Sequence, residues 1–279
     1  MRAKKIRKPQ AKTALEYKNI SGYVNFTQKE QAHLEDYCAS YTAYLGASKT
    51  ERQAHDQAVT LLREAGFQDL NKLAKEGQPL GRGAKIYRSC GGKTLAAFVL
   101  GKLLLENGMR LVGGHTDAPR LDVKQNPLYE EAGLALLDTH YYGGIKKYQW
   151  VTIPLALHGI FVKPDGRKIT VSLGEEPGEP VFFISDLLPH LAQDQSAKTM
   201  AKAITGEGLD VLVGSMPWPG KKLPSPVKRR VLEELKKRYG VDESDFMSAE
   251  LEFVPVGKPR EAGFDRSMII GYGQDDRVC

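Results

Sequence analysis

Two pairs of side chains in this sequence have the residue types that bind divalent metal ions. His115 and Asp117 follow an apolar run and precede Pro119, and Asp275 and Asp276 follow a second apolar stretch within the 279 residues. Side chains two residues apart on a strand share a face, so His115 and Asp117 can point the same way. A zinc-binding histidine usually donates its second N–H to a carboxylate, and adjacent carboxylates repel unless a cation lies beside them. The two pairs together indicate a two-metal hydrolase, in which one carboxylate bridges both ions.

Each pair has a simpler interpretation when taken alone. A histidine at a strand end is more often a hydrogen-bonded structural residue than a metal ligand. An Asp-Asp-Arg sequence is often an exposed turn. The metal hypothesis therefore depends on both pairs occurring in one chain.

Composition narrows the class of protein. The chain is 41% hydrophobic, which is enough for a sizeable core, and it has neither an apolar stretch of membrane-spanning length nor the apolar core of a secretory signal. We expect a cytoplasmic globular protein without membrane partners. Its three scattered cysteines argue against a disulfide framework and a cysteine-ligated zinc site.

The net charge of +6 raises the alternative of nucleic-acid binding. Much of the excess lies in the N-terminal segment and in residues 221–238, where Glu233 and Glu234 interleave with the basic residues. That pattern is typical of a solvated helix face. We therefore predict that nucleic acid is not a partner.

The pattern of apolar residues predicts an α/β fold, a mixed sheet sandwiched by helices, with a mainly β insertion. Helices are expected from the capping box at Thr27 and over residues 50–65, and strands over 86–88, 94–101 and 109–114, the last a buried central strand that ends at His115. Residues 124–255 alternate short apolar runs with turns. Strands are expected there at 150–157, 159–163, 168–173, 180–184 and 251–255, and helices at 199–205 and 225–239. We predict a first domain over 1–123, an inserted domain over 124–255 and a return to the first domain over 256–279, where residues 268–273 would join its sheet.

Four motifs carry a specific resemblance to a known family. They are GHTDAPRL at 114–121, KQNPLY at 124–129, YGGI at 142–145 and GYGQDDR at 271–277. Together they resemble the bacterial aminopeptidase I branch of the aspartyl aminopeptidase family, whose members are di-zinc aminopeptidases. The resemblance implies that His115 binds one zinc, that Asp275 bridges both, that Asp117 is a catalytic residue whose acidic side chain lies behind His115, and that Asp276 supports the site.

The resemblance also implies peptide substrates, two zinc ions per complete site, with cobalt or manganese able to substitute, and a hollow dodecamer. Residues 124–255 would be the dimerisation domain. From it His190 would reach a neighbouring subunit's active site and take part in substrate binding and catalysis. The preferred N-terminal residue, acidic or neutral, stays open.

Family members continue beyond the position of Asp275 into a second half of the catalytic domain. The general-base glutamate and the remaining zinc ligands lie there. We therefore expect this chain to carry part of a zinc-dependent aminopeptidase site and to be inactive alone. The alternative is a catalytically inert oligomerisation module.

Overall fold

The structure is a computed structural model that describes residues 19–220 and 223–273. The chain divides into two compact units, Met1–Tyr41 and Thr42–Cys279. The described part of the first unit holds the 3-10 helix η1 (Gly22–Val24) and most of helix α1 (Gln28–Ala47). The Thr27 hydroxyl accepts from the Glu30 amide at 3.2 Å, and the Glu30 carboxylate accepts from the Thr27 amide at 2.8 Å. This reciprocal pair is the predicted capping box, and it fixes the start of α1.

The second unit begins with a helix and a small mixed sheet. Helix α2 (Glu51–Glu64) starts at a capping box between Thr50 and Gln53, close to the predicted bounds. In the sheet, β1 (Gln68–Asp69) is parallel to β2 (Lys85–Cys90), which is antiparallel to β3 (Thr94–Val99). The strands predicted at 86–88 and 94–101 are thus confirmed. The short helix α3 (Leu70–Lys75) was not predicted.

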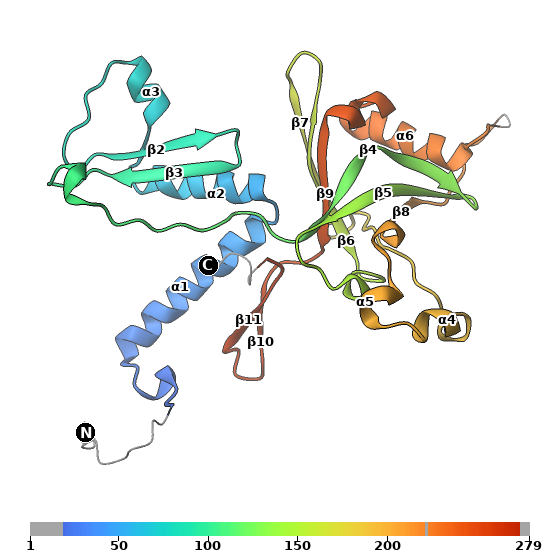
Figure 1. The fold of residues 1–279 in the computed structure, drawn as a ribbon, viewed down its shortest axis with the longest axis horizontal. Helices are drawn as coiled ribbons and strands as arrows, with labels where there is room; N and C mark the ends of the chain where they lie inside the picture. Colours follow the sequence, from blue (N-terminus) through green and yellow to red (C-terminus); the bar gives the residue numbers. More distant parts are fainter. Residues whose placement is uncertain (1–18, 221–222, 274–279) are drawn as a thin grey trace. The chain divides into compact units, whose positions relative to one another are not determined.

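Residues 120–255 contain a six-stranded sheet (Figure 1). In spatial order its strands are β7 (Lys168–Leu173), β6 (Leu155–Val162), β9 (Ala249–Pro255), β4 (Arg120–Glu131), β5 (Leu134–Tyr142) and β8 (Val211–Gly214). Helix α6 (Pro226–Tyr239) packs on β4, β5 and β8. The main hydrophobic cluster of buried residues, from Leu121 to Phe253, comes entirely from this region. Burial of the apolar area of this cluster contributes most of the free energy that stabilises the sheet.

Several predicted boundaries inside this region shift. The runs at 150–157 and 159–163 form one strand, β6, because Gly159 stays in the ladder opposite Leu251. Residues 180–184 do not form the predicted strand: Phe182 bridges to Leu155, Phe183 bridges to Leu212, and the Ile184 carbonyl accepts a hydrogen bond from the Thr152 amide. Short helical segments fill the connections: η3 (Lys147–Gln149), η4 (Pro189–Leu191), α4 (Gln193–Ser196), α5 (Met200–Ala203), η5 (Gly206–Gly208) and η6 (Glu243–Ser248).

The prediction of a central strand over residues 109–114 is wrong, because these residues are described and form no strand. After η2 (Leu105–Asn107) the chain runs without regular hydrogen bonding up to β4, and Leu111 and Val112 are 85% and 97% exposed. A strand exists only where a neighbour accepts its backbone hydrogen bonds, and the described residues offer none here. Similarly, β11 (Met268–Ile270) pairs with β10 (Arg260–Ala262) as a two-stranded hairpin, not with the β1–β3 sheet.

The basic residues of α6 lie beside acidic ones, as the charge pattern predicted. Arg229 pairs with Glu233 and Arg230 with Glu234, each four residues apart on the helix.

Among the described residues, none of the helices has the length and apolar character needed to cross a membrane.

Candidate functional site

The predicted pair of His115 and Asp117 is formed. The Nδ1 atom of His115 lies 3.0 Å from Oδ1 of Asp117 and 3.0 Å from the Asp117 carbonyl oxygen. Both oxygens are acceptors, so Nδ1 carries the proton and donates. Nε2 then holds a lone pair and has no hydrogen-bond partner in the described part of the chain. With side-chain exposures of 43% and 33%, the pair is open to solvent.

This arrangement fits the donor chemistry of zinc. A neutral imidazole with one nitrogen anchored on a carboxylate presents its other nitrogen as a ligand, and the anchor fixes both tautomer and ring orientation. The partial burial of Asp117 acts to raise its pKa, but hydrogen bonds from Tyr142, its own backbone and His115 outweigh burial and lower that pKa. Asp117 is therefore a carboxylate over the whole neutral range.

A tyrosine links the two predicted ligand segments. The hydroxyl of Tyr272 donates a hydrogen bond to the backbone carbonyl of Pro119. Tyr272 is three residues before Asp275, and Pro119 is four residues after His115. Asp275 and Asp276 themselves lie outside the described residues. The tether nevertheless holds the chain that leads to them beside the chain that carries His115.

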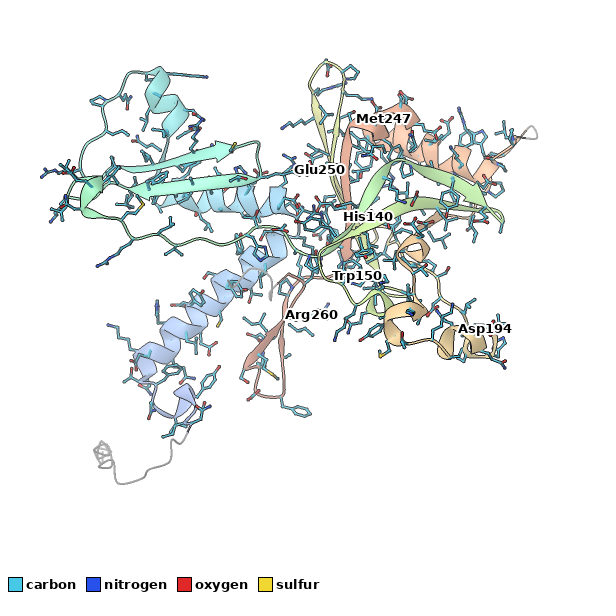
Figure 2. All side chains as sticks on the ribbon, viewed as in Figure 1. His140, Trp150, Asp194, Met247, Glu250 and Arg260 are labelled. Carbon is cyan, nitrogen blue, oxygen red and sulfur yellow. The ribbon has the colours of Figure 1, made fainter. Side chains whose placement is uncertain are left out.

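Three other histidines, His190, His140 and His158, have separate environments. His190 is exposed on η4, between the exposed side chains of Leu188 and Leu191. His140 is exposed on β5 (Figure 2) and stacks on Tyr141 with ring centroids 5.5 Å apart. His158 is buried, with its ring nitrogens 3.0 Å from Glu175 and 3.0 Å from Gln53, so it has a structural role.

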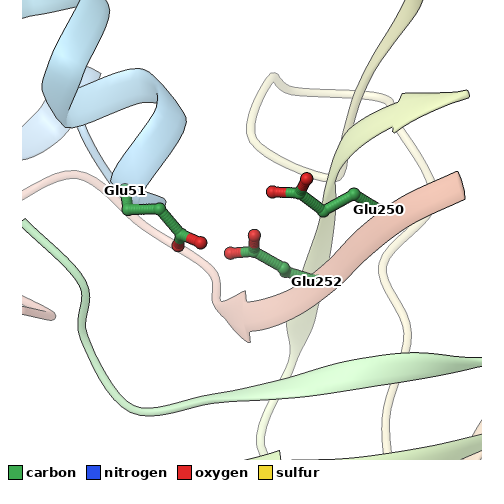
Figure 3. Close-up of side chains that lie close together, drawn as sticks. All are labelled: Glu51, Glu250 and Glu252. Atoms are coloured by element: carbon green, nitrogen blue, oxygen red, sulfur yellow. The ribbon is translucent and has the colours of Figure 1, made fainter. Parts of the chain in front are cut away.

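Sequence reasoning missed a buried group of three carboxylates. Glu51 at the start of α2 and Glu250 and Glu252 on β9 point toward one another (Figure 3), with a ligand oxygen from each within 4.8 Å of the others. Glu252 is 1% exposed. Burial and, next, the charge of Glu51 raise the pKa of Glu252 to about 8, although Arg120 acts in the opposite direction. Two glutamates two residues apart in an apolar strand share one face, which is the signal that could have located them.

Protein cations already neutralise this group. Arg120 lies 3.1 Å from Glu51 and 3.4 Å from Glu252. Lys93 lies 3.1 Å from Glu51 and also pairs with Glu250. With two basic side chains between the carboxylates, the group is an ion-pair network that joins α2, β4 and β9, and it is not a metal centre.

Comparisons with known proteins show the family of this chain. The family model for aminopeptidase I zinc metalloproteases (M18) matches residues 44–279. The chain belongs to this family. A probable M18 family aminopeptidase 1 of Clostridium acetobutylicum is 46% identical over 265 residues, which cover 95% of this chain and 56% of the relative.

Solved structures of the family have the same fold. The aminopeptidase (M18 family) of Thermotoga maritima superposes with a TM-score of 0.85 at 39% identity, over 94% of this chain and 56% of that one. The mApe1 dodecamer of S. cerevisiae matches with a TM-score of 0.60 at 19% identity, over 85% of this chain and 52% of that one, which shows a common fold alone. The α/β fold class expected from the sequence is confirmed.

The chain spans about half the length of the curated relatives it matches. The family is one of zinc metalloproteases. Zinc is therefore the metal expected for this family, and Nε2 of His115, which is free among the described residues, is a nitrogen donor of the kind that zinc binds.

Proposed function

We propose that this chain supplies part of the metal site of a zinc aminopeptidase that releases N-terminal residues from peptides. The observation that carries the proposal is His115, whose Nδ1 is held by Asp117 and whose Nε2 is free among the described residues. The Tyr272 tether supports it, because Asp275 follows three residues later. His115 and Asp275 would hold zinc, and Asp276 would support that site.

Zinc would supply a Lewis acid and a water of lowered pKa. The chain's own residues orient the site. Asp117 keeps the proton of His115 on Nδ1, and its negative charge makes the imidazole a better donor. Two ions per complete site, with cobalt or manganese able to replace zinc, remain part of the proposal.

Peptide substrates and self-association complete the proposed function. Residues 124–255, which contain most of the six-stranded sheet and of its core, would form an inserted dimerisation domain, between a first part over 1–123 and a return over 256–279. The exposed Leu187, Leu188 and Leu191 around His190 give this domain an apolar surface suited to a second copy. A dodecamer with His190 beside a neighbouring site, and a cytoplasmic location, are proposed on the same family resemblance.

A chimera tests the activity. This chain would be fused to the remaining part of the C. acetobutylicum relative, and hydrolysis would be measured on a peptide with a free α-amino group and on its N-acetylated form. We expect release of the N-terminal residue from the free peptide alone, abolition by His115→Ala, and little effect of His140→Ala, a matched control at an exposed histidine. Equal activity of the His115→Ala and His140→Ala chimeras would refute the role of His115.

The unfused chain tests the competing function of an inert oligomerisation module. We expect weak zinc binding that His115→Ala removes, no peptide turnover, and association detected by light scattering. Zinc binding that is unchanged in His115→Ala, together with stable association, would favour the inert module.

A further inference from the structure

An apolar cavity lies between helix α6 and the face of the six-stranded sheet that α6 covers, with a volume of about 320 Å³. Its floor consists of buried side chains of β5, β6, β7 and β9, among them Leu157, Val171 and Leu251. The described lining contains no residue of the segment around His115 and no member of the buried ion-pair network. The cavity is therefore a feature separate from the site described above.

Helix α6 separates apolar from charged groups along one side of the cavity. Side chains four residues apart lie above one another on a helix. One such row lines the cavity and packs on the core, and it consists of Val231, Leu235 and Tyr239. The neighbouring row also lines the cavity but is charged, and it consists of Arg230, Glu234 and Arg238. The cavity therefore has an apolar interior and a charged margin.

Two of the three charged residues already have partners. Arg230 and Glu234 form an ion pair, with 3.4 Å between nitrogen and oxygen. The Arg230 guanidinium also covers the ring of Trp218, with its central carbon 5.5 Å from the ring centroid. These contacts use the charges of both residues, so neither is the main attraction for a charged ligand.

Arg238 is the available cation of this margin. Its side chain is exposed, and it forms no ion pair with any described residue. The carboxylate of Glu179 acts on it at longer range, and Glu179 itself accepts hydrogen bonds from the backbone amides of residues 174–176. Beside Arg238, burial raises the pKa of Tyr239, so its phenol is protonated at neutral pH, and its hydroxyl makes no hydrogen bond within the described part of the chain. These two groups together can bind one carboxylate.

The size of the cavity defines the apolar part of a ligand. A cavity of about 150 Å³ with an apolar lining stays dry and binds benzene. The cavity beside α6 has about twice that volume, so it accommodates roughly twelve carbon atoms. Its interior offers apolar contact, and its unpaired charge lies at one end of the α6 row. An amphipathic molecule with one anionic end matches both properties.

We propose that this cavity binds a fatty acid of about ten to twelve carbons as a free molecule. Its chain lies between Leu235 of α6 and the floor of the sheet, and its carboxylate accepts hydrogen bonds from Arg238 and Tyr239. The bound chain fills the space between α6 and the sheet, so it stabilises the folded sheet region. This inference goes beyond the proposed aminopeptidase function and does not depend on it.

Decanoate is the probe, added to the 279-residue chain, and the readout is NMR of leucine and valine methyl groups. We expect one saturable site, with magnetisation transfer from the bound chain to methyl groups of Leu157, Val171 and Leu235. The melting temperature should rise with decanoate concentration, because the ligand binds the folded chain.

Decanol has the same chain without the charge, so it separates the two parts of the site. Arg238→Gln should weaken decanoate binding by about fivefold, the scale of one exposed ion pair, and leave decanol binding unchanged. Lys237→Gln is the matched control, because Lys237 carries the same charge one position earlier on α6 but does not line the cavity. Val213→Phe, which fills cavity space from β8, should weaken the binding of both ligands in a chain whose amide spectrum is otherwise native.

Three results would overturn the proposal. One is magnetisation transfer confined to leucines of residues 103–105, which would mean that decanoate binds exposed apolar surface. Another is an equal loss of decanoate binding in Arg238→Gln and Lys237→Gln. The third is self-association, measured by light scattering, that Val213→Phe abolishes while decanoate reaches none of the cavity methyl groups, which would make a second copy of the chain the occupant. None of these measurements involves zinc or peptide hydrolysis, so a failure of the aminopeptidase proposal would leave them unchanged.

Discussion

Adding a single carbon at Gly159 should lower the free energy of unfolding strongly. It lies in β6 opposite Leu251 of β9, with φ of +136°. A Cβ at this position would be 1.9 Å from the backbone carbonyl oxygen of Glu250. Gly159→Ala therefore forces apart two central strands of the sheet that carries Glu250 and Glu252.

The size of the effect follows from that distance. Real Cβ atoms stay at least 3.0 Å from other heavy atoms, so the strands must separate locally by 1.1 Å, which is 3.0 minus 1.9 Å. A ladder hydrogen bond stretched by that amount is lost. Two or three lost bonds at about 1 kcal/mol each, with about 1–3 kcal/mol for alanine at this φ, give a destabilisation of about 3–6 kcal/mol. Whole domains are stable by only about 5–15 kcal/mol, so the sheet should be close to unfolding.

Gly166→Ala is the control. Gly166 lies in the turn between β6 and β7 at φ of +83°, and a Cβ there would meet nothing within 4 Å. Urea unfolding, followed through Trp150 and Trp218 fluorescence, should show a loss of about 1–2 kcal/mol for this variant. Equal losses in the two variants would refute the reasoning, because they would mean that φ alone, and not the contact with Glu250, sets the cost.

Three further changes test the packing and the buried charges. Phe253→Ala, at a fully buried core position, should lower the free energy of unfolding by about 3–5 kcal/mol in the same urea assay. The pKa of Glu252 is raised to about 8, so native stability should fall as pH rises from about 4.5 to 8, by a few kcal/mol in order of magnitude, and Glu252→Gln should flatten that slope. Burial opposes the shift at Glu175, but hydrogen bonds from His158 and Lys49 lower its pKa to about 2. The stability that ionised Glu175 adds to the folded state is therefore complete above about pH 4.5 and is lost as the pH falls toward 2. Glu175→Gln should make the melting temperature depend less on pH in this acidic range.

Local signals in the sequence located the elements that depend on local chemistry. The capping box at Thr27 and the apolar patterns of residues 50–65 and 225–239 predicted α1, α2 and α6 within a few residues, because caps and amphipathic faces are set by neighbours along the chain. The pair of His115 and Asp117 was predictable for the same reason, since two residues suffice to form it.

Elements that depend on distant partners were not located correctly. Residues 109–114 have a strand's composition, but pairing decides whether a strand forms. The contact of Tyr142 with Arg120 joins β5 to the start of β4, and no spacing rule predicts that those two side chains stack. The Glu51, Glu250 and Glu252 group likewise required the folded arrangement of α2 and β9.

The exposed apolar side chains of residues 103–112 should prolong chaperone binding to the newly made chain. Leu103, Leu104, Leu105, Met109, Leu111 and Val112 are each at least 67% exposed, whereas the core from Leu121 to Phe253 is closed by residues of the same region. Synthesis proceeds from the N-terminus, so this row leaves the ribosome before the sheet that follows it, and the described residues of that sheet do not cover it after folding. Chaperones bind exposed apolar segments with unpaired backbone, and such segments also promote aggregation. When the 279-residue chain is made by itself, chaperone crosslinks should therefore persist at residues 103–112 after they have disappeared from residues 121–253.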